Sequence, residues 1–231
     1  MNCLCCGKPL KEDSKFGWHK ACIKHFFGTE ILPEMEFDND SLTLLVLETA
    51  NQGFTVPGVQ KKLLLHLTSG RKKPRFTLVN FPTGYILKPQ IEEFKALPES
   101  EQLIMSMADK VGISTVPHAL IKNKTGLAYI TKRIDRIISK DKVSLLAMED
   151  FCQLDLRLTE DKYRGSYEHC AEIIKKYSSR IGIDITEFYL RIVFCFIVGN
   201  SDMHLKKFLT YWNWWRKWWI YTFTRLRLIT S

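Results

Sequence analysis

The segment Val198–Phe208, which reads VGNSDMHLKKF, places one acid, one imidazole and two ammonium groups within six residues. An apolar stretch with helical periodicity precedes it, and Gly199 and Asn200 are expected to end that helix. A carboxylate held at a helix end can accept a proton from an attacking hydroxyl or bind Mg²⁺, and a nearby Lys can neutralise phosphate. The spacing alone fits a solvated turn equally well. Asp202 is therefore a candidate catalytic residue whose role depends on its partners.

A second group of reactive side chains opens the chain. Two pairs have the close spacing of metal ligands: Cys3 with Cys6, and His19 with Cys22. Twelve residues separate the pairs, which fits a tetrahedral Zn²⁺ site able to order a segment too small to bury its own core. The alternative is a set of reduced surface cysteines. We predict a zinc knuckle, with the choice among Cys22, His19 and His25 left open.

The composition is typical of a cytoplasmic globular protein. With 231 residues and 45% hydrophobic content, the chain can bury a core. Seven Cys, an odd number, do not resemble a secreted disulfide framework, and no apolar run approaches the roughly 18 residues that span a bilayer. Residues 205–231 hold six basic residues and no acid, so the other 28 basic and 25 acidic residues contribute only +3 to the net charge of +9. An extended nucleic-acid surface is therefore not expected.

The elements that would position the reactive residues are strands first and helices after. Strands are predicted over Leu63–Leu67, Phe76–Val79, Tyr85–Lys88, Val116–Ile121 and Leu127–Thr131. Helices are predicted over Leu42–Asn51, Glu99–Val111, Leu145–Gln153, Tyr167–Tyr177 and Asp184–Val198. In the second of these helices, Leu103, Met107 and Val111 face one way. This order of elements predicts an α+β fold with two lobes.

Five features follow one another in an order that suggests phosphoryl transfer. They are a glycine-containing turn, a strand Lys, a helix Glu, an Arg/Asp segment and the GNxDxH sequence that contains Asp202. Each has an ordinary explanation by itself, such as a solvated edge-strand Lys or a Glu that interacts with a helix dipole. Taken together, the Lys would neutralise the phosphates, the Glu would orient that Lys, and the Asp would position the hydroxyl nucleophile.

These segments resemble the HipA family of bacterial serine/threonine kinases, the toxins of type II toxin–antitoxin systems. The matching stretches begin at Thr55 (TVPGVQKKL), Tyr85 (YILKP), Glu99 (ESEQ), Lys132 (KRIDR), Met148 (MEDFCQ) and Gly199 (GNSDMHLK). They span residues 55–208 in the family's order, and the Cys/His opening resembles a knuckle that some short members carry. The resemblance implies a protein-kinase-like two-lobed fold that is truncated in its helical lobe. It also implies transfer of phosphate from Mg·ATP to a Ser or Thr of a target protein.

The resemblance also assigns roles to single residues. Lys88 would contact the ATP phosphates, Glu101 would form an ion pair with it, and Asp202 would be the catalytic Asp. ATP and Mg²⁺ are therefore the expected cofactors, beside the structural Zn²⁺.

The turn from Thr55 to Lys61 would be the family's phosphate-side loop. Its cofactor-binding residues would be Gly58, Gln60 and Lys61. Thr55 stands where the family has an autophosphorylated Ser, so a hydroxyl that can accept phosphate is retained.

Three departures from the family pattern bear on activity. Lys132 replaces the usual acid of the hinge segment, so no specific hinge contact with ATP is carried over. The family's long N-terminal subdomain is missing, and in three-component members a separate small protein supplies it. Lys207 replaces an Asn that binds Mg²⁺, and the later segment with a second Mg²⁺-binding Asp is absent. A Lys at a metal-ligand position repels the cation, so we expect this chain to be inactive.

The resemblance also implies partners. A helix-turn-helix antitoxin would bind the protein, and a separately encoded small protein would supply the N-terminal subdomain. The phosphorylated target would be of the aminoacyl-tRNA synthetase type. DNA would be bound only indirectly through the antitoxin, and no membrane is expected. The alternative function is a non-catalytic remnant that binds an antitoxin or another partner protein.

The tail over residues 209–231 contains five of the six Trp and is expected to be out of frame. Trp has a single codon, so a shift of one nucleotide turns every Trp into Gly. Deleting one adenine at Lys206-Lys207 can restore Asn and, further on, the family's Pro-x-Tyr-Asp-Leu segment. A basic, aromatic segment that inserts at a membrane surface is the alternative.

The predicted organisation therefore has five parts. A zinc knuckle covers residues 1–26, a linker and helix 27–52, an ATP-binding small lobe 53–136, the start of a helical lobe 137–208, and an out-of-frame tail 209–231.

Sequencing the source DNA from codon 200 to about a hundred codons past the stop tests the predicted frameshift. Removing one adenine at Lys206-Lys207 should open a long frame that encodes Asn and then Pro-Ala-Tyr-Asp-Leu. Downstream DNA without such a frame would make the tail authentic and favour the partner-binding alternative.

Overall fold

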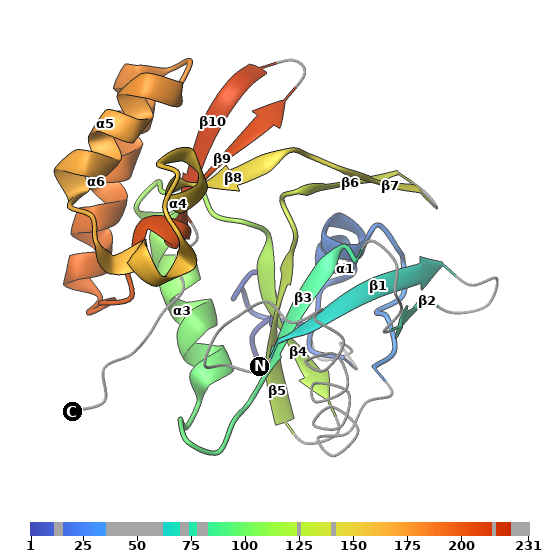
Figure 1. Ribbon diagram of the computed structural model, residues 1–231. Helices are drawn as coiled ribbons and strands as arrows, with labels where there is room; N and C mark the ends of the chain where they lie inside the picture. Colours follow the sequence, from blue (N-terminus) through green and yellow to red (C-terminus); the bar gives the residue numbers. More distant parts are fainter. Residues whose placement is uncertain are drawn as a thin grey trace. The chain divides into compact units, whose positions relative to one another are not determined.

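The computed structural model describes residues 1–11, 16–35, 62–69, 74–77, 83–123, 126–139, 142–213 and 216–222. The chain divides into two compact units, shown as a ribbon in Figure 1. Unit 1 contains Met1–Leu103 and Thr115–Ser144, and unit 2 contains Ile104–Ser114 and Leu145–Ser231. The predicted helix over Leu42–Asn51 and the turn from Thr55 to Lys61 lie outside the described residues.

Unit 1 is built on a five-stranded antiparallel sheet with the order β2-β1-β3-β5-β4 (Figure 1). The strands are β1 (Leu63–Ser69), β2 (Pro74–Thr77), β3 (Tyr85–Pro89), β4 (His118–Asn123) and β5 (Gly126–Lys132). All five were predicted, although β2 begins two residues before the predicted strand and β4 two residues after. β3 is the central strand, and its Lys88 pairs with Tyr129 of β5.

The core of unit 1 joins the Cys/His segment to this sheet. Helix α1 (Lys20–Phe27) places Phe26 and Phe27 against Tyr85 of β3, with ring centroids 6.1 and 5.8 Å from that of Tyr85. Tyr85 and Leu87 are buried on one face of β3, and side chains alternate along a strand, so Lys88 lies on the other face. The packing of α1 therefore fixes the direction in which Lys88 points.

Helix α3 (Leu97–Lys110) confirms the predicted helix, and the structure shows which of its faces is buried. Leu103 and Met107 are 60% and 42% exposed, whereas Ile104 and Ala108 are buried. Both stripes have the same spacing of four residues, so periodicity alone could not choose between them. Packing within unit 2 decides which stripe is buried, because Ile104 and Ala108 form a hydrophobic cluster with Phe194 of α6 (Ile181–Ile197).

Unit 2 combines helices with a three-stranded antiparallel sheet of order β10-β9-β8 (Figure 1). Its elements are β8 (Met148–Asp150), α4 (Phe151–Leu154), the 3₁₀ turn η1 (Thr159–Tyr163), α5 (Tyr167–Tyr177), α6 (Ile181–Ile197), the 3₁₀ turn η2 (Leu205–Lys207), β9 (Phe208–Asn213) and β10 (Arg216–Thr222). A separate two-stranded sheet, which belongs to unit 1 except for its last residue, pairs β6 (Arg136–Ser139) with β7 (Lys142–Leu145). Phe151, Ile174 and Phe208 are central members of the core of unit 2.

The predicted helix over Leu145–Gln153 is wrong. Leu145 ends β7, β8 follows, and α4 begins only after Asp150. The Asp150 carboxylate accepts a hydrogen bond from Gln153 N at 2.9 Å, and Gln153 Oε1 accepts one from Asp150 N at 2.8 Å. This reciprocal capping box sets the helix start. It pairs the backbone N–H groups of Asp150 and Gln153, which have no partner within the helix.

The remaining helices of unit 2 follow the prediction. α5 has the predicted bounds, and Ser166 caps it by accepting a hydrogen bond from His169 N at 3.2 Å. α6 begins three residues before the predicted start. Among the described residues, no helix combines the length and the apolar character needed to traverse a bilayer.

The segment predicted to be an out-of-frame tail begins as part of the sheet. Leu209 and Thr210 of β9 pair with Asp150 and Glu149 of β8. Thr210 is fully buried, and its hydroxyl donates to Glu149 O at 3.3 Å. These pairings place the start of the segment in the sheet. They do not test the shifted reading frame, which stays a prediction.

Candidate active site

Lys88 and Glu101 form a buried ion pair within unit 1. Lys88 Nζ lies 2.5 Å from Glu101 Oε1, and the two side chains are 11% and 3% exposed. The ammonium also lies 5.2 Å from the ring centroid of Tyr129, the residue that pairs with Lys88 across the sheet. The sequence placed Lys88 on a strand and Glu101 on a helix, and the fold brings the two charges together.

Within the part of the chain that the structure describes, one oxygen of this pair lacks a hydrogen-bond donor. Glu101 Oε2 is buried and has no hydrogen-bond partner among the described residues. An unpaired buried carboxylate oxygen costs free energy, so the arrangement suits a site that gains a further group when a ligand binds. Gly58, Gln60, Lys61 and Thr55, which the sequence assigned to the same site, lie outside the described residues.

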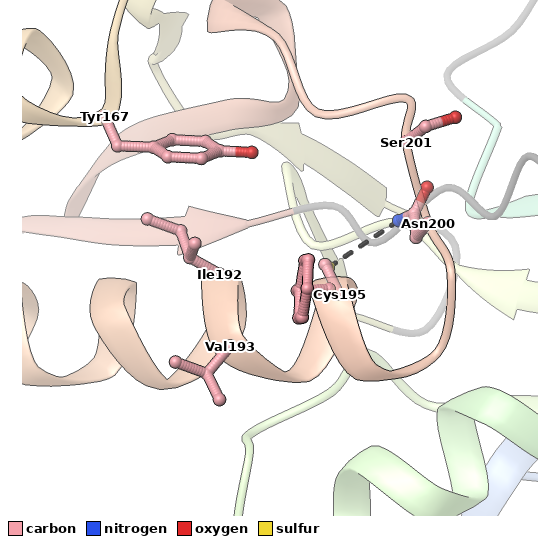
Figure 2. Close-up of a pocket in the computed structure, with 7 residues that line it drawn as sticks. Tyr167, Ile192, Val193, Cys195, Asn200 and Ser201 are labelled. Carbon is pink, nitrogen blue, oxygen red and sulfur yellow. Dashed lines mark hydrogen bonds between the residues drawn. The ribbon is translucent and has the colours of Figure 1, made fainter.

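Asp202 lies in unit 2, just after the C-terminal end of α6. Gly199 has a φ of +69°, which ends the helix, and Asn200 N donates to Cys195 O at 2.8 Å. The Asn200 side chain is buried and contacts Cys195 Sγ at 3.6 Å (Figure 2). It also accepts a hydrogen bond from Asp202 N at 3.2 Å. The helix end and the buried amide together fix the backbone that carries Asp202.

A buried Lys neutralises the Asp202 carboxylate. Lys207 Nζ lies 2.9 Å from Asp202 Oδ2, and the two side chains are 8% and 13% exposed. The other carboxylate oxygen, Oδ1, accepts from the Tyr163 hydroxyl at 3.4 Å and lies 3.6 Å from His204 Nε2. Sequence analysis missed Tyr163, which comes from η1, because nothing in its local sequence points to Asp202.

The residues around Asp202 do not fit Mg²⁺. A metal bound to this carboxylate would lie about 5 Å from the Lys207 ammonium, given metal–oxygen distances of about 2.1 Å. At an effective dielectric constant of about 20, the repulsion is roughly 6–7 kcal/mol.

His204 is held neutral beside this pair. Burial and the charges of Lys207, Lys162 and Lys206 together lower its pKa to about 4, although the Asp202 carboxylate opposes them. His204 Nδ1 accepts a hydrogen bond from Lys206 N at 3.2 Å, which caps η2. The ring therefore acts as a structural acceptor that positions the turn bearing Lys207.

The Arg/Asp segment forms a compact network in unit 1. Asp135 is buried, and its two oxygens accept from Arg133 Nε and Nη2 at 2.9 and 2.6 Å. Arg136 Nη1 lies 2.5 Å from Asp135 Oδ2. Burial opposes the effect of these cations, but the hydrogen bonds and charge of Arg133, with the charge of Arg136, lower the pKa of the Asp135 carboxyl. Asp135 here serves to hold the chain after β5.

The four predicted zinc ligands lie close together in unit 1. The ligand atoms of Cys3, Cys6, His19 and Cys22 are all within 4.8 Å of one another. Cys5 and His25, the further ligand types in the sequence, are not members of this cluster.

Comparison with known proteins identifies the family. The model described as HipA-like C-terminal domain matches residues 54–221, which is most of the chain. The chain therefore belongs to the HipA-like C-terminal domain family.

Its relatives are longer and carry kinase names. A Haemophilus influenzae protein named "Putative kinase" is 28% identical over 218 residues, covering 87% of this chain and 60% of that protein. "Putative kinase Y4mE" of Sinorhizobium fredii is 28% identical over 177 residues, covering 73% of this chain and 41% of that protein. The chain thus spans between about two fifths and three fifths of the length of these curated relatives.

A solved structure has the same fold. It is the Shewanella oneidensis toxin–antitoxin complex of HipA, HipB and operator DNA, with a TM-score of 0.56 and 20% identity. The match covers 68% of this chain and 40% of that chain.

We expect His204→Asn to reduce the acid sensitivity of the protein. The folded-state pKa of His204 is about 4 and the ordinary value is 6.5, so between these pH values only the unfolded chain binds the proton. The free energy of unfolding should therefore fall as the pH decreases from about 6.5 towards about 4. Urea unfolding followed by circular dichroism at pH 7 and pH 5 should show a smaller loss for the variant. Equal losses in both proteins would contradict the shifted pKa.

We also expect Lys207→Asn to create divalent-cation binding at Asp202. Electron paramagnetic resonance of Mn²⁺ should show roughly tenfold or greater tightening relative to the unchanged protein, because the repulsive charge is gone. The added Asp202→Asn change should abolish the gain. The control is Lys206→Asn, whose ammonium contacts Thr159 Oγ1 at 3.1 Å rather than Asp202. Binding to the unchanged protein that depends on Asp202 would contradict the prediction.

Proposed function

We propose that this chain is a HipA-like serine/threonine kinase homologue that binds ATP but does not transfer its phosphate. In the proposed parent reaction, phosphate passes from Mg·ATP to a Ser or Thr hydroxyl of a target protein. The parent would be the toxin of a type II toxin–antitoxin system. The observation that carries the proposal is a contrast between two ion pairs. In the Lys88–Glu101 pair the Lys is held in position to bind phosphate, whereas in the Asp202–Lys207 pair the Lys occupies the carboxylate that would act in catalysis.

Lys88 supports nucleotide binding. Its ammonium is on the face of β3 opposite the core, and Glu101 fixes its position through a charge-assisted hydrogen bond. ATP would supply the transferable phosphoryl group when bound. Lys88 would neutralise its phosphates, and the Thr55–Lys61 turn would contribute backbone and side-chain donors as the family resemblance implies.

Lys207 supports the absence of transfer. A nucleophilic hydroxyl loses its proton best to a carboxylate that is free to accept it, and Asp202 Oδ2 is instead 2.9 Å from an ammonium. The same ammonium disfavours the cation that would neutralise the developing charge on the phosphates. Asp202 would therefore be a retained catalytic position without its catalytic environment.

We expect Lys88→Met to weaken ATP binding about 10- to 100-fold. A hydrogen bond to a charged group contributes roughly 1.5–3 kcal/mol, and a loss of 1.4 kcal/mol is about a tenfold change in affinity. Isothermal titration calorimetry with ATP measures the change, and Lys110→Met, at the exposed end of α3, is the matched control. Equal affinity of Lys88→Met and the unchanged chain would exclude the proposed site.

Phosphoryl transfer is tested separately. The unchanged chain, incubated with radiolabelled ATP, Mg²⁺ and a generic protein substrate, should label neither itself nor the substrate above a no-enzyme blank. Measurable ATP-dependent phosphorylation would overturn the inactive assignment while leaving ATP binding intact.

A second candidate function is partner binding, which the exposed face of α6 favours. Tyr189, Phe196 and Ile197 are 68%, 83% and 72% exposed, which is unusual for large apolar side chains on one helix. Proposed partners are a helix-turn-helix antitoxin, through which DNA would be reached indirectly, and a small protein that supplies a HipA N-terminal subdomain. The target of an active relative would be of the aminoacyl-tRNA synthetase type.

We expect this partner function to depend on α6. Co-expression with a helix-turn-helix protein encoded beside the gene should yield a complex that Phe196→Asp disrupts. The matched control is Leu103→Asp on α3, another exposed apolar position. A complex that forms equally with both variants would exclude the α6 face as the contact.

A further inference from the structure

The Cys/His cluster has the dimensions of a zinc site. Zn–S distances of about 2.3 Å and Zn–N distances of about 2.0–2.1 Å place a sulfur and a nitrogen ligand roughly 3.5–3.6 Å apart in a tetrahedral site. His19 Nδ1 lies 3.4 Å from Cys6 Sγ and 3.8 Å from Cys22 Sγ. The three atoms therefore surround a point at which one tetrahedral ion would fit.

The other nitrogen of His19 determines which ring atom is available to a metal. His19 Nε2 lies 3.0 Å from Pro9 O, and a carbonyl oxygen can only accept a hydrogen bond. Nε2 must therefore carry the proton, which leaves the Nδ1 lone pair directed at the sulfurs in the neutral ring. A carbonyl that fixes the imidazole tautomer in this way is the usual companion of a metal-bound His.

Backbone hydrogen bonds fix the loop that carries Cys3 and Cys6. Cys3 N donates to Lys8 O at 2.8 Å and Gly7 N donates to Cys3 O at 2.9 Å, which closes a tight turn around Cys6. Gly7 has a φ of +69°, a conformation that a side chain would strain. His19 N also donates to Cys3 Sγ at 3.4 Å, so a hydrogen bond links the Cys3/Cys6 pair to the His19/Cys22 pair without an ion.

This segment is tied to the sheet that carries Lys88. Leu120 N of β4 donates to Leu4 O at 2.9 Å. Gln102, the neighbour of Glu101 on α3, donates through Nε2 to Cys5 O at 3.3 Å. Tyr85 of β3 donates through its hydroxyl to Phe26 O at 3.4 Å. The loops that hold the four ligands are therefore bonded to the elements that hold the Lys88–Glu101 pair.

We propose that Cys3, Cys6, His19 and Cys22 bind one Zn²⁺ ion, and that this ion stabilises unit 1 and the Lys88–Glu101 pair within it. Three thiolates and one imidazole are a usual ligand set for structural zinc, and four protein ligands leave no open position for a substrate. The ion supplies cross-links between residues 3–6 and 19–22. Those links hold α1 on the sheet, so loss of zinc should loosen the packing of Phe26 and Phe27 against Tyr85.

Metal content and ligand identity are measured on the complete chain purified without chelators. Inductively coupled plasma mass spectrometry should find about one zinc per chain in the unchanged protein. Cys6→Ser and His19→Asn should each lose most of the zinc. The matched controls Cys5→Ser and His25→Asn should keep it, because they remove the same side-chain types outside the cluster.

A spectroscopic measurement covers the case in which a ligand variant fails to fold. Replacing zinc by Co²⁺ in the unchanged chain should give the intense ligand-field and sulfur-to-metal absorption of a tetrahedral thiolate-rich site. Removing the metal with a chelator should lower the melting temperature by more than about 5 °C. The same treatment should weaken ATP binding in the calorimetric assay, if the chain binds ATP.

Three results would overturn the proposal. They are a metal-free chain after zinc-supplemented expression, a cobalt spectrum without thiolate bands, or equal loss of zinc from Cys5→Ser and Cys6→Ser. A chain that holds zinc but binds no ATP would refute the proposed nucleotide function and leave the zinc site standing.

Discussion

The aromatic packing of α1 against β3 is the contact on which unit 1 depends. Four aromatic rings meet there. Their centroids are 5.6 to 6.1 Å apart in the pairs Phe26–Tyr85, Phe27–Tyr85, Phe27–Phe76 and Phe76–Tyr85. Burying Tyr85 and Leu87 on this side leaves Lys88 on the opposite face, since strand side chains alternate. The N-terminal segment is thus part of the same core as the sheet, and the position of Lys88 depends on both.

In unit 2 the comparable constraint is charge compensation around Asp202. The end of α6 and the buried Asn200 hold the backbone, while Lys207, Tyr163 and His204 surround the carboxylate. A buried carboxylate needs such compensation, because an unpaired charge in the interior is costly. An ammonium meets that need, but unlike a divalent metal it offers no coordination positions to phosphate oxygens. The surroundings of Asp202 are therefore stable in a form that differs from a metal-dependent catalytic site.

Membership of the HipA-like C-terminal domain family accounts for the fold more fully than for the activity. The family match covers residues 54–221, and the structural similarity to HipA is at the level of fold. A fold depends on packing along the whole chain, whereas phosphoryl transfer depends on a few charged atoms, so the two properties are decided at different scales.

Features set by neighbouring residues could be predicted from the sequence. The strand carrying Lys88, the bounds of α5 and the glycine stop after α6 follow from periodicity, caps and φ preferences that act within a few residues. The spacing of Cys3, Cys6, His19 and Cys22 also indicated that these side chains form a cluster, although it left His25 as an alternative. Only the tertiary structure separated His19 from His25, because it brings the ring of His19, and not that of His25, to the sulfurs of Cys6 and Cys22. It also decided which stripe of α3 is buried, because a helix with two apolar stripes buries the one that meets a neighbour.

Tyr163 reaches Asp202 from 39 residues away and Gln102 reaches Cys5 from 97 residues away. Such contacts depend on how distant segments pack, and no local pattern in the sequence encodes them.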